Sequence, residues 1–183
     1  MKRILLTALL VAASAVLLPA ATIDLQFSSP VIAQGDTFTM MVNVSGVFDG
    51  MSGDYLLGFG LNPFISLPAN VIFLGATVNP LFNDDSGVFP GVAVAGDTWL
   101  ADPGTSLSLT LATLTFQAIG SGFVNLGVMS DVSDSNQGLI FVSSSADLTT
   151  SGTIDVVPEP AAAFLIVPSL AALLLAARRR RPV

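Results

Sequence analysis

Carboxylates are the side chains of this sequence that could perform acid–base or metal chemistry. The chain has no His and no Cys, its six Lys and Arg residues stand at positions 2, 3 and 178–181, and its 13 Asp and Glu residues lie between them. Catalysis needs a group that titrates near neutrality, or a nucleophile with a base beside it. We therefore predict no enzymatic activity. One alternative stays open, a secreted carbohydrate-active hydrolase that uses a pair of Asp residues.

Two short segments concentrate the oxygen ligands that Ca²⁺ prefers. They span 83–86 and 131–136, and neither has the spacing or the closing Glu of an EF-hand loop. The candidate ligands are Asp84, Asp85, Asp131 and Asp134. Calcium is the one cofactor that these segments suggest, and solvated turns are the alternative.

The charge distribution limits the partners. Between positions 21 and 160 the chain is a polyanion without any Lys, Arg or His. Such a domain cannot neutralise phosphates, so nucleic acid is excluded as a partner, and anionic lipid would repel it. Because the carboxylates lack ion-pair partners, bound metal ions or solvation must cover them. Without Cys there are no disulfides, so stability must come from the core alone.

The N-terminus has the three parts of a secretory signal peptide. A basic start at positions 1–3 precedes an apolar run over 4–18, and small residues follow. We predict a signal peptide over residues 1–21, cut by signal peptidase near Ala20 or Ala21. An uncleaved anchor is the alternative.

The C-terminus combines an apolar segment with a basic cluster. Residues 161–177 are apolar except for Pro168 and Ser169, and about 25 Å of helix would just cross a thin bilayer. Basic residues stay on the cytoplasmic side of a membrane, so the body of the protein would lie outside the cytoplasm. The residues that set this orientation are Arg178, Arg179, Arg180 and Arg181.

The segment between these ends, residues 22–156, has the pattern of β-strands. Apolar residues alternate with polar ones over 37–44, 57–61 and 124–128, and Asn62-Pro63 is expected to end the second run. About eight or nine short strands separated by Gly, Pro and Asp turns predict an all-β sandwich or jelly roll.

Two local features of this segment give testable predictions. The apolar positions change from odd (Leu109, Leu111) to even (Leu114, Phe116), which requires a bulge or bend near residues 112–113. The turn Gly120-Ser121-Gly122 is expected to close a tight hairpin between its flanking strands.

The extended tetrapeptide that follows resembles a known sorting signal. Its prolines cannot enter a helix interior or a central strand. It consists of Val157, Pro158, Glu159 and Pro160. Together with the apolar segment and the arginines, residues 157–183 resemble the PEP-CTERM signal that exosortases recognise in Gram-negative bacteria. The resemblance implies an exosortase-type enzyme as a partner, transient residence in the inner membrane, and release to the cell surface or extracellular matrix.

A second resemblance concerns the β-domain. Residues 35–46, followed by 57–63 and by 111–116, are similar to segments of cohesin domains, which are nine-stranded jelly-roll sandwiches. In that family the strand matching 57–63 usually ends in Asp-Pro, where this chain has Asn62-Pro63. The resemblance implies a cohesin-like sandwich, with a dockerin-like protein as one candidate partner.

These predictions describe an exported surface or matrix protein. It would have a signal peptide (1–21), a sandwich ectodomain (22–156) and a sorting tail (157–183), and would serve adhesion, assembly or protein docking. The partner would be a protein or an exopolysaccharide, and a permanently membrane-anchored protein is a further alternative.

Overall fold

The computed structural model describes residues 22–45, 56–98, 108–142 and 144–159. Among these residues there are strands and turns but no helix. The strands are β1 (Thr22–Phe27), β2 (Val31–Ala33), β3 (Thr37–Ser45), β4 (Leu56–Ile65), β5 (Val71–Val78), β6 (Asn83–Asp84), β7 (Val94–Asp97), β8 (Ser108–Ala118), β9 (Gly122–Met129), β10 (Gly138–Phe141), β11 (Ser145–Ala146) and β12 (Thr150–Val157). Nine of these have four or more residues, which confirms the predicted all-β class and strand number.

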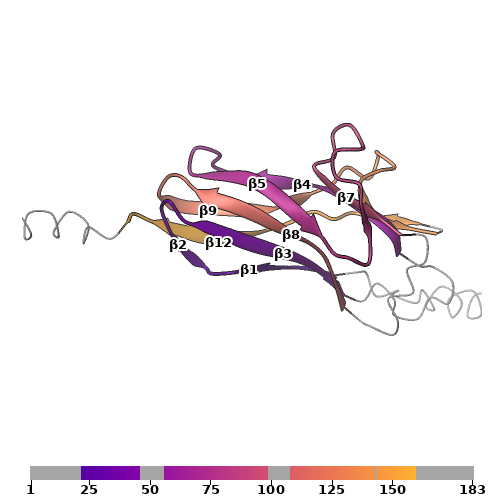
Figure 1. Ribbon diagram of the computed structural model, residues 1–183, viewed down its shortest axis with the longest axis horizontal. Coiled ribbons are helices and arrows are strands. Elements are labelled where there is room, and N and C mark those ends of the chain that lie inside the picture. Colours follow the sequence, from indigo (N-terminus) through magenta and orange to yellow (C-terminus); the bar gives the residue numbers. More distant parts are fainter. Residues whose placement is uncertain (1–21, 46–55, 99–107, 143, 160–183) are drawn as a thin grey trace, which may run out of the picture.

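The strands form two sheets that run along the length of the molecule (Figure 1). The first sheet has the order β1-β3-β8-β5, and the second contains β11-β10-β4-β9-β12-β2 with β7 and β6 beside β4. From β3 to β9 the longer strands alternate between the two sheets, so strands that are consecutive in sequence face each other across the core. This alternation produces a sandwich of the jelly-roll kind.

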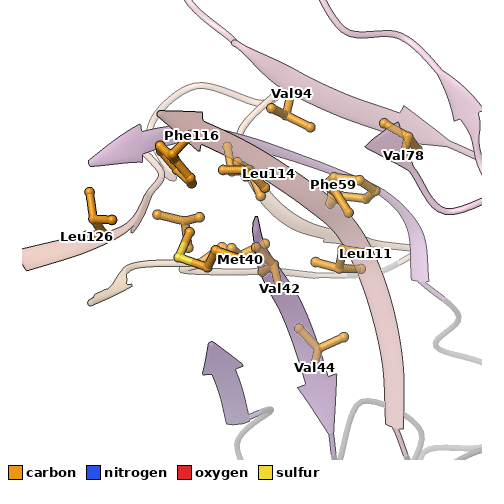
Figure 2. Close-up of a cluster of buried hydrophobic side chains, with 14 of the residues drawn as sticks. Met40, Val42, Val44, Phe59, Val78, Val94, Leu111, Leu114, Phe116 and Leu126 are labelled. Atoms are coloured by element: carbon orange, nitrogen blue, oxygen red, sulfur yellow. The ribbon is translucent and has the colours of Figure 1, made fainter. Parts of the chain in front are cut away.

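The core lies between the sheets and is built by the alternating apolar residues. Phe38, Met40, Val42 and Val44 of β3 are all buried, as their period-two spacing predicts. Figure 2 shows three of these side chains, Met40, Val42 and Val44, with partners from the opposite sheet that include Phe59 of β4. Each large apolar side chain buried in this way contributes about 1.5–3 kcal/mol. Because this apolar layer extends through the domain, the described part of the chain folds around one core.

The predicted irregularity of β8 is a bulge. Val42 of β3 pairs with Ala112, and the next residue, Asn43, pairs with Thr110, which leaves Leu111 as an extra residue. Both Leu111 and Ala112 are buried. The inserted residue therefore shifts the apolar positions from odd to even, and the prediction is confirmed.

Two other local predictions are wrong. The turn at 120–122 does not close a hairpin, because β8 already lies between β3 and β5, and the chain crosses to the other sheet as β9. Asn70 holds this crossing, since its carbonyl accepts from Gly120 N (3.0 Å) and its Nδ2 donates to the Ser121 carbonyl (2.8 Å). The second run does not end at Asn62-Pro63 either, because β4 continues to Ile65 by pairing with β9.

Candidate functional site

Two connections lie over the outer face of β4 at one end of the sandwich (Figure 1). One is the 79–93 connection between β5 and β7, which contains β6. The other is the 130–137 loop between β9 and β10. The partner of β4 changes from Met129, opposite Asn62, to Gly138, opposite Gly60. β9 and β10 therefore pair one after the other with β4, and the 130–137 loop connects the end of β9 to the start of β10.

Asn62 joins the two connections. Its Oδ1 accepts from Ala93 N (2.8 Å), and its Nδ2 donates to the Gly91 carbonyl (2.8 Å) and to Gln137 Oε1 (3.4 Å). The neighbouring outward position on β4 is Gly60, where a Cβ would collide with the Asn136 backbone oxygen. The absence of a side chain at Gly60 and the amide of Asn62 thus allow both connections to pack against β4.

A hollow of about 260 Å³ opens beside this junction. Its floor and walls come from the start of β4, from β7 and β10, and from the two connections. The apolar residues that line it include Leu57, Phe59, Phe89 and Ile140. Two carboxylates, Asp85 and Asp97, complete the lining. The site is therefore an apolar recess that carries two acidic groups.

Asp85 and Asp97 are close enough to perturb each other. Desolvation raises the pKa of Asp85, and the negative charge of Asp97, a side-chain hydrogen bond to Asp97 and the charge of Asp84 raise it further. Asn83 Nδ2 donates to Asp97 Oδ1 at 3.0 Å. Because the negative charge of Asp97 opposes ionisation of Asp85, an incoming cation would be favoured at this pair. The sequence analysis names Asp85 as a candidate ligand but not Asp97. The latter lies further along the chain, and no motif links the two residues.

The carboxylates of the 130–137 loop have the opposite environment. Asp131 Oδ1 accepts from Ser133 N (3.0 Å) and Ser133 Oγ (2.6 Å). Asp134 accepts from Asn136 N (3.0 Å) and Gln137 Nε2 (3.3 Å). These hydrogen bonds stabilise the ionised forms and lower the pKa of both Asp131 and Asp134. The expectation that metal or solvent alone must cover the carboxylates is therefore incomplete, because the loop supplies its own donors.

The structure separates the predicted calcium ligands into two places. Asp84 and Asp85 belong to the 79–93 connection, whereas Asp131 and Asp134 belong to the 130–137 loop. Among the described residues, no group of three or more Asp, Glu, His or Cys side chains could hold a metal ion. Asp84 Oδ1 accepts from Ser86 N at 3.0 Å, so this carboxylate also caps a turn. Calcium binding stays a prediction.

The tail leaves the opposite end of the sandwich. Val157 is the last residue of β12 and pairs with Ala33 of β2, and its carbonyl accepts from Gln34 N at 2.8 Å. Pro158 and Glu159 follow at once and are exposed. The remaining sorting and signal residues lie outside the described residues: Ala20, Ala21, Pro160, Arg178, Arg179, Arg180 and Arg181. In the described ranges, no helix is long and apolar enough to span a membrane.

Comparison with known proteins gives structural likeness without sequence relatives. No family model matches the chain, and no curated protein matches it. A cohesin module from a Clostridium perfringens family 33 glycoside hydrolase is 13% identical with a TM-score of 0.49, covering 76% of this chain and 100% of the module. A type II cohesin domain of Acetivibrio cellulolyticus is 13% identical with a TM-score of 0.42, covering 74% and 95% respectively. A type I cohesin of Pseudobacteroides cellulosolvens is also 13% identical, with a TM-score of 0.41 and coverage of 74% and 94%.

Proposed function

We propose that this chain is an exported surface or matrix protein whose sandwich docks a partner protein in the hollow between β4, β7 and β10. The observation that carries the proposal is the Asp85–Asp97 pair in an apolar recess. The described residues supply no cation to this pair, because every Lys and Arg stands at position 2, 3 or 178–181. A Lys or Arg of the partner would relieve the repulsion.

The apolar walls of the hollow also restrict which partner side chains can fit. Leu57, Phe89 and Ile140 can cover the methylene stem of a Lys or Arg while its charged end reaches the two carboxylates. Asp131 and Asp134 are already occupied by donors within their own loop, so they have less to gain from a partner. The hollow therefore suits an extended segment with a basic residue next to an apolar one, as a dockerin-like protein could provide.

The sorting part of the proposal rests on the tail. A signal peptidase would remove residues 1–21, and an exosortase-type enzyme would act near Val157, Pro158, Glu159 and Pro160, as the PEP-CTERM resemblance implies. The C-terminal segment would hold the exported protein transiently in the inner membrane of a Gram-negative bacterium, and processing would then release it to the cell surface or matrix. Intact-mass measurement of the mature protein tests this step, because an unprocessed C-terminus would favour a permanent membrane anchor.

The Asp85–Asp97 pair also bears on the alternative of a hydrolase. Glycoside hydrolysis needs two carboxyl groups about 5–9.5 Å apart, with the sugar carbon between them. The pKa of Asp85 is raised by the charge of Asp97 and by hydrogen bonding to it, which favours two carboxyl groups side by side over two on opposite sides of a sugar carbon. The geometry of this pair thus supports binding better than catalysis.

The docking proposal is tested by capture of partners from a surface extract of the native organism, with and without calcium. We expect the wild-type chain to retain a discrete protein, and the double variant Asp85→Asn/Asp97→Asn to lose it. The matched control is Asp131→Asn/Asp134→Asn, which should keep the partner. Retention by the first variant, or capture of polysaccharide alone, would contradict the proposal.

A further inference from the structure

The outer face of the second sheet has a further exposed part, away from the two connections. It is formed by the C-terminal half of β4 together with β9, β12 and β2. Its outward side chains include those we call the platform: Val31, Phe64, Phe123, Asn125, Ser151, Thr153 and Asp155. The alternate residues of β9 and β12, such as Leu126 and Ile154, point into the core.

The platform holds two aromatic rings that face solvent. Phe123 is 72% exposed and Phe64 is 37% exposed, while the other described phenylalanines are buried or half-buried. Phe64 lies opposite Gly127 on β9, and Phe123 lies four residues from Gly127 on the same strand. At about 3.3 Å per residue, the backbone positions of the two rings are about 13 Å apart along the strand direction. Exposed rings that are not in contact with each other require an explanation other than core packing.

Neutral polar groups occupy the space between the rings. Asn125 pairs with Thr153 across β9 and β12, and Thr153 Oγ1 donates to Asn125 Oδ1 at 2.7 Å. Ser151 stands opposite Gly127, which has no side chain, and the β12 backbone at Thr150 and Ser151 approaches Gly127 closely. An amide and two hydroxyls can both donate and accept hydrogen bonds. The face therefore alternates apolar rings with uncharged hydrogen-bonding groups.

We propose that the platform binds an uncharged polysaccharide. The C–H faces of sugar rings can pack on Phe64 and Phe123, and sugar hydroxyls can bond to Asn125, Thr153 and the Asp155 carboxylate. Asp155 and the formal net charge of −7 repel an acidic polymer. A protein partner usually buries a clustered apolar centre, whereas here a polar row separates the two rings. This site is independent of the docking hollow, because it shares none of the hollow's residues.

The experiment is retention of the full chain, in a detergent without a sugar headgroup, on insoluble cellulose, β-1,3-glucan and chitin, with alginate beads as the acidic polymer. We expect retention on at least one uncharged polymer and none on alginate. Phe123→Ala should weaken retention about tenfold, which corresponds to about 1.4 kcal/mol of binding free energy. Phe123 is 72% exposed, so this truncation leaves no cavity in the core.

Two variants make the test specific. Leu74→Ala removes a side chain that is 52% exposed on β5, in the other sheet, and should bind like the wild type. Asp85→Asn/Asp97→Asn should keep polysaccharide binding even where it loses the protein partner, so the two proposals can fail separately. Equal binding to alginate, no retention on any uncharged polymer, or unchanged retention of Phe64→Ala/Phe123→Ala would overturn the proposal.

Discussion

The 79–93 connection and the 130–137 loop both lie over β4, and both carry carboxylates. The surroundings of the carboxylates differ between the two regions. In the 130–137 loop, hydroxyl, amide and backbone donors hold Asp131 and Asp134 and lower their pKa. In the 79–93 connection, Asp85 instead lies near another carboxylate, Asp97 of β7, and the pKa of Asp85 is raised.

This difference shows how to separate structural from functional carboxylates in a domain without cations. A carboxylate whose oxygens are filled by neighbouring donors stabilises its own loop. A carboxylate held near another one lowers stability while it is ionised, and a group perturbed in this way is a candidate for binding. On this criterion Asp147 belongs with the structural group, since Ser130 and Thr149 donate to it and lower its pKa.

The largest expected effect comes from Gly60→Ala. The new Cβ would collide with the Asn136 backbone oxygen, which cannot move without releasing the 130–137 loop from β4. We expect a loss of about 3 kcal/mol in the free energy of unfolding, measured by urea denaturation. If the loop loses its structure, the hydrogen bonds to Asp131 and Asp134 should be lost with it, and these carboxylates would then no longer differ from those of the 79–93 connection.

Gly87→Ala is the control for that change. Gly87 has a φ of +80° but no atom within 4 Å of an added Cβ, so only the backbone conformation opposes the substitution. We expect a cost of about 1 kcal/mol. An equal cost at both positions would mean that Gly60 does not hold the loop by close approach.

Asn62→Asp should have the next largest effect. The variant loses the donor to the Gly91 carbonyl and Gln137 Oε1 and places a charge beside these oxygens, at a cost of about 2 kcal/mol. Faster hydrogen exchange at the amides of residues 93 and 137 would show that both connections loosen together. The control is Asn125→Asp, where Thr153 Oγ1 can still donate to the new carboxylate. A change confined to one connection would show that Asn62 does not couple them.

The residues show which parts of this structure were accessible from the sequence. Alternation identified the buried face of β3, and the phase change identified the Leu111 bulge, because both depend on local spacing. The crossing at residues 120–122 was missed because a Gly-Ser-Gly turn has the same composition whether it joins paired strands or two sheets. Its geometry depends on Asn70, about fifty positions away.

The candidate site was less accessible for the same reason. Acidic clustering in the sequence singles out Asp84, Asp85, Asp131 and Asp134 as candidate calcium ligands, and of these four Asp85 lines the hollow. Asp97, Asn62 and Gly60 were missed, since their roles arise from the pairing of β4 with β7 and from the connections that cross it. No spacing rule in a single sequence predicts which distant carboxylate will meet Asp85.

The smallest expected effects are changes in thermal stability with pH, and they compare the carboxylates of the two regions directly. Asp97→Asn removes the charge that faces Asp85, so at pH 7 we expect thermal unfolding to shift upward by about 1–2 °C. Because the pKa of folded Asp85 is raised, protonation stabilises the wild type as the pH falls through that value. The advantage of the variant should therefore shrink towards pH 3.8, the ordinary value for Asp.

Asp134→Asn should give the opposite sign. The lowered pKa of Asp134 contributes stability that is present above the ordinary value of 3.8 and is lost as the pH falls through the folded value. We expect thermal unfolding about 1–2 °C lower than the wild type at pH 7, with the deficit disappearing in acid. Thermal unfolding of both variants between pH 2.5 and 7 measures the two signs together. If both variants shifted in the same direction at pH 7, the two regions would not differ in the way their hydrogen bonds indicate.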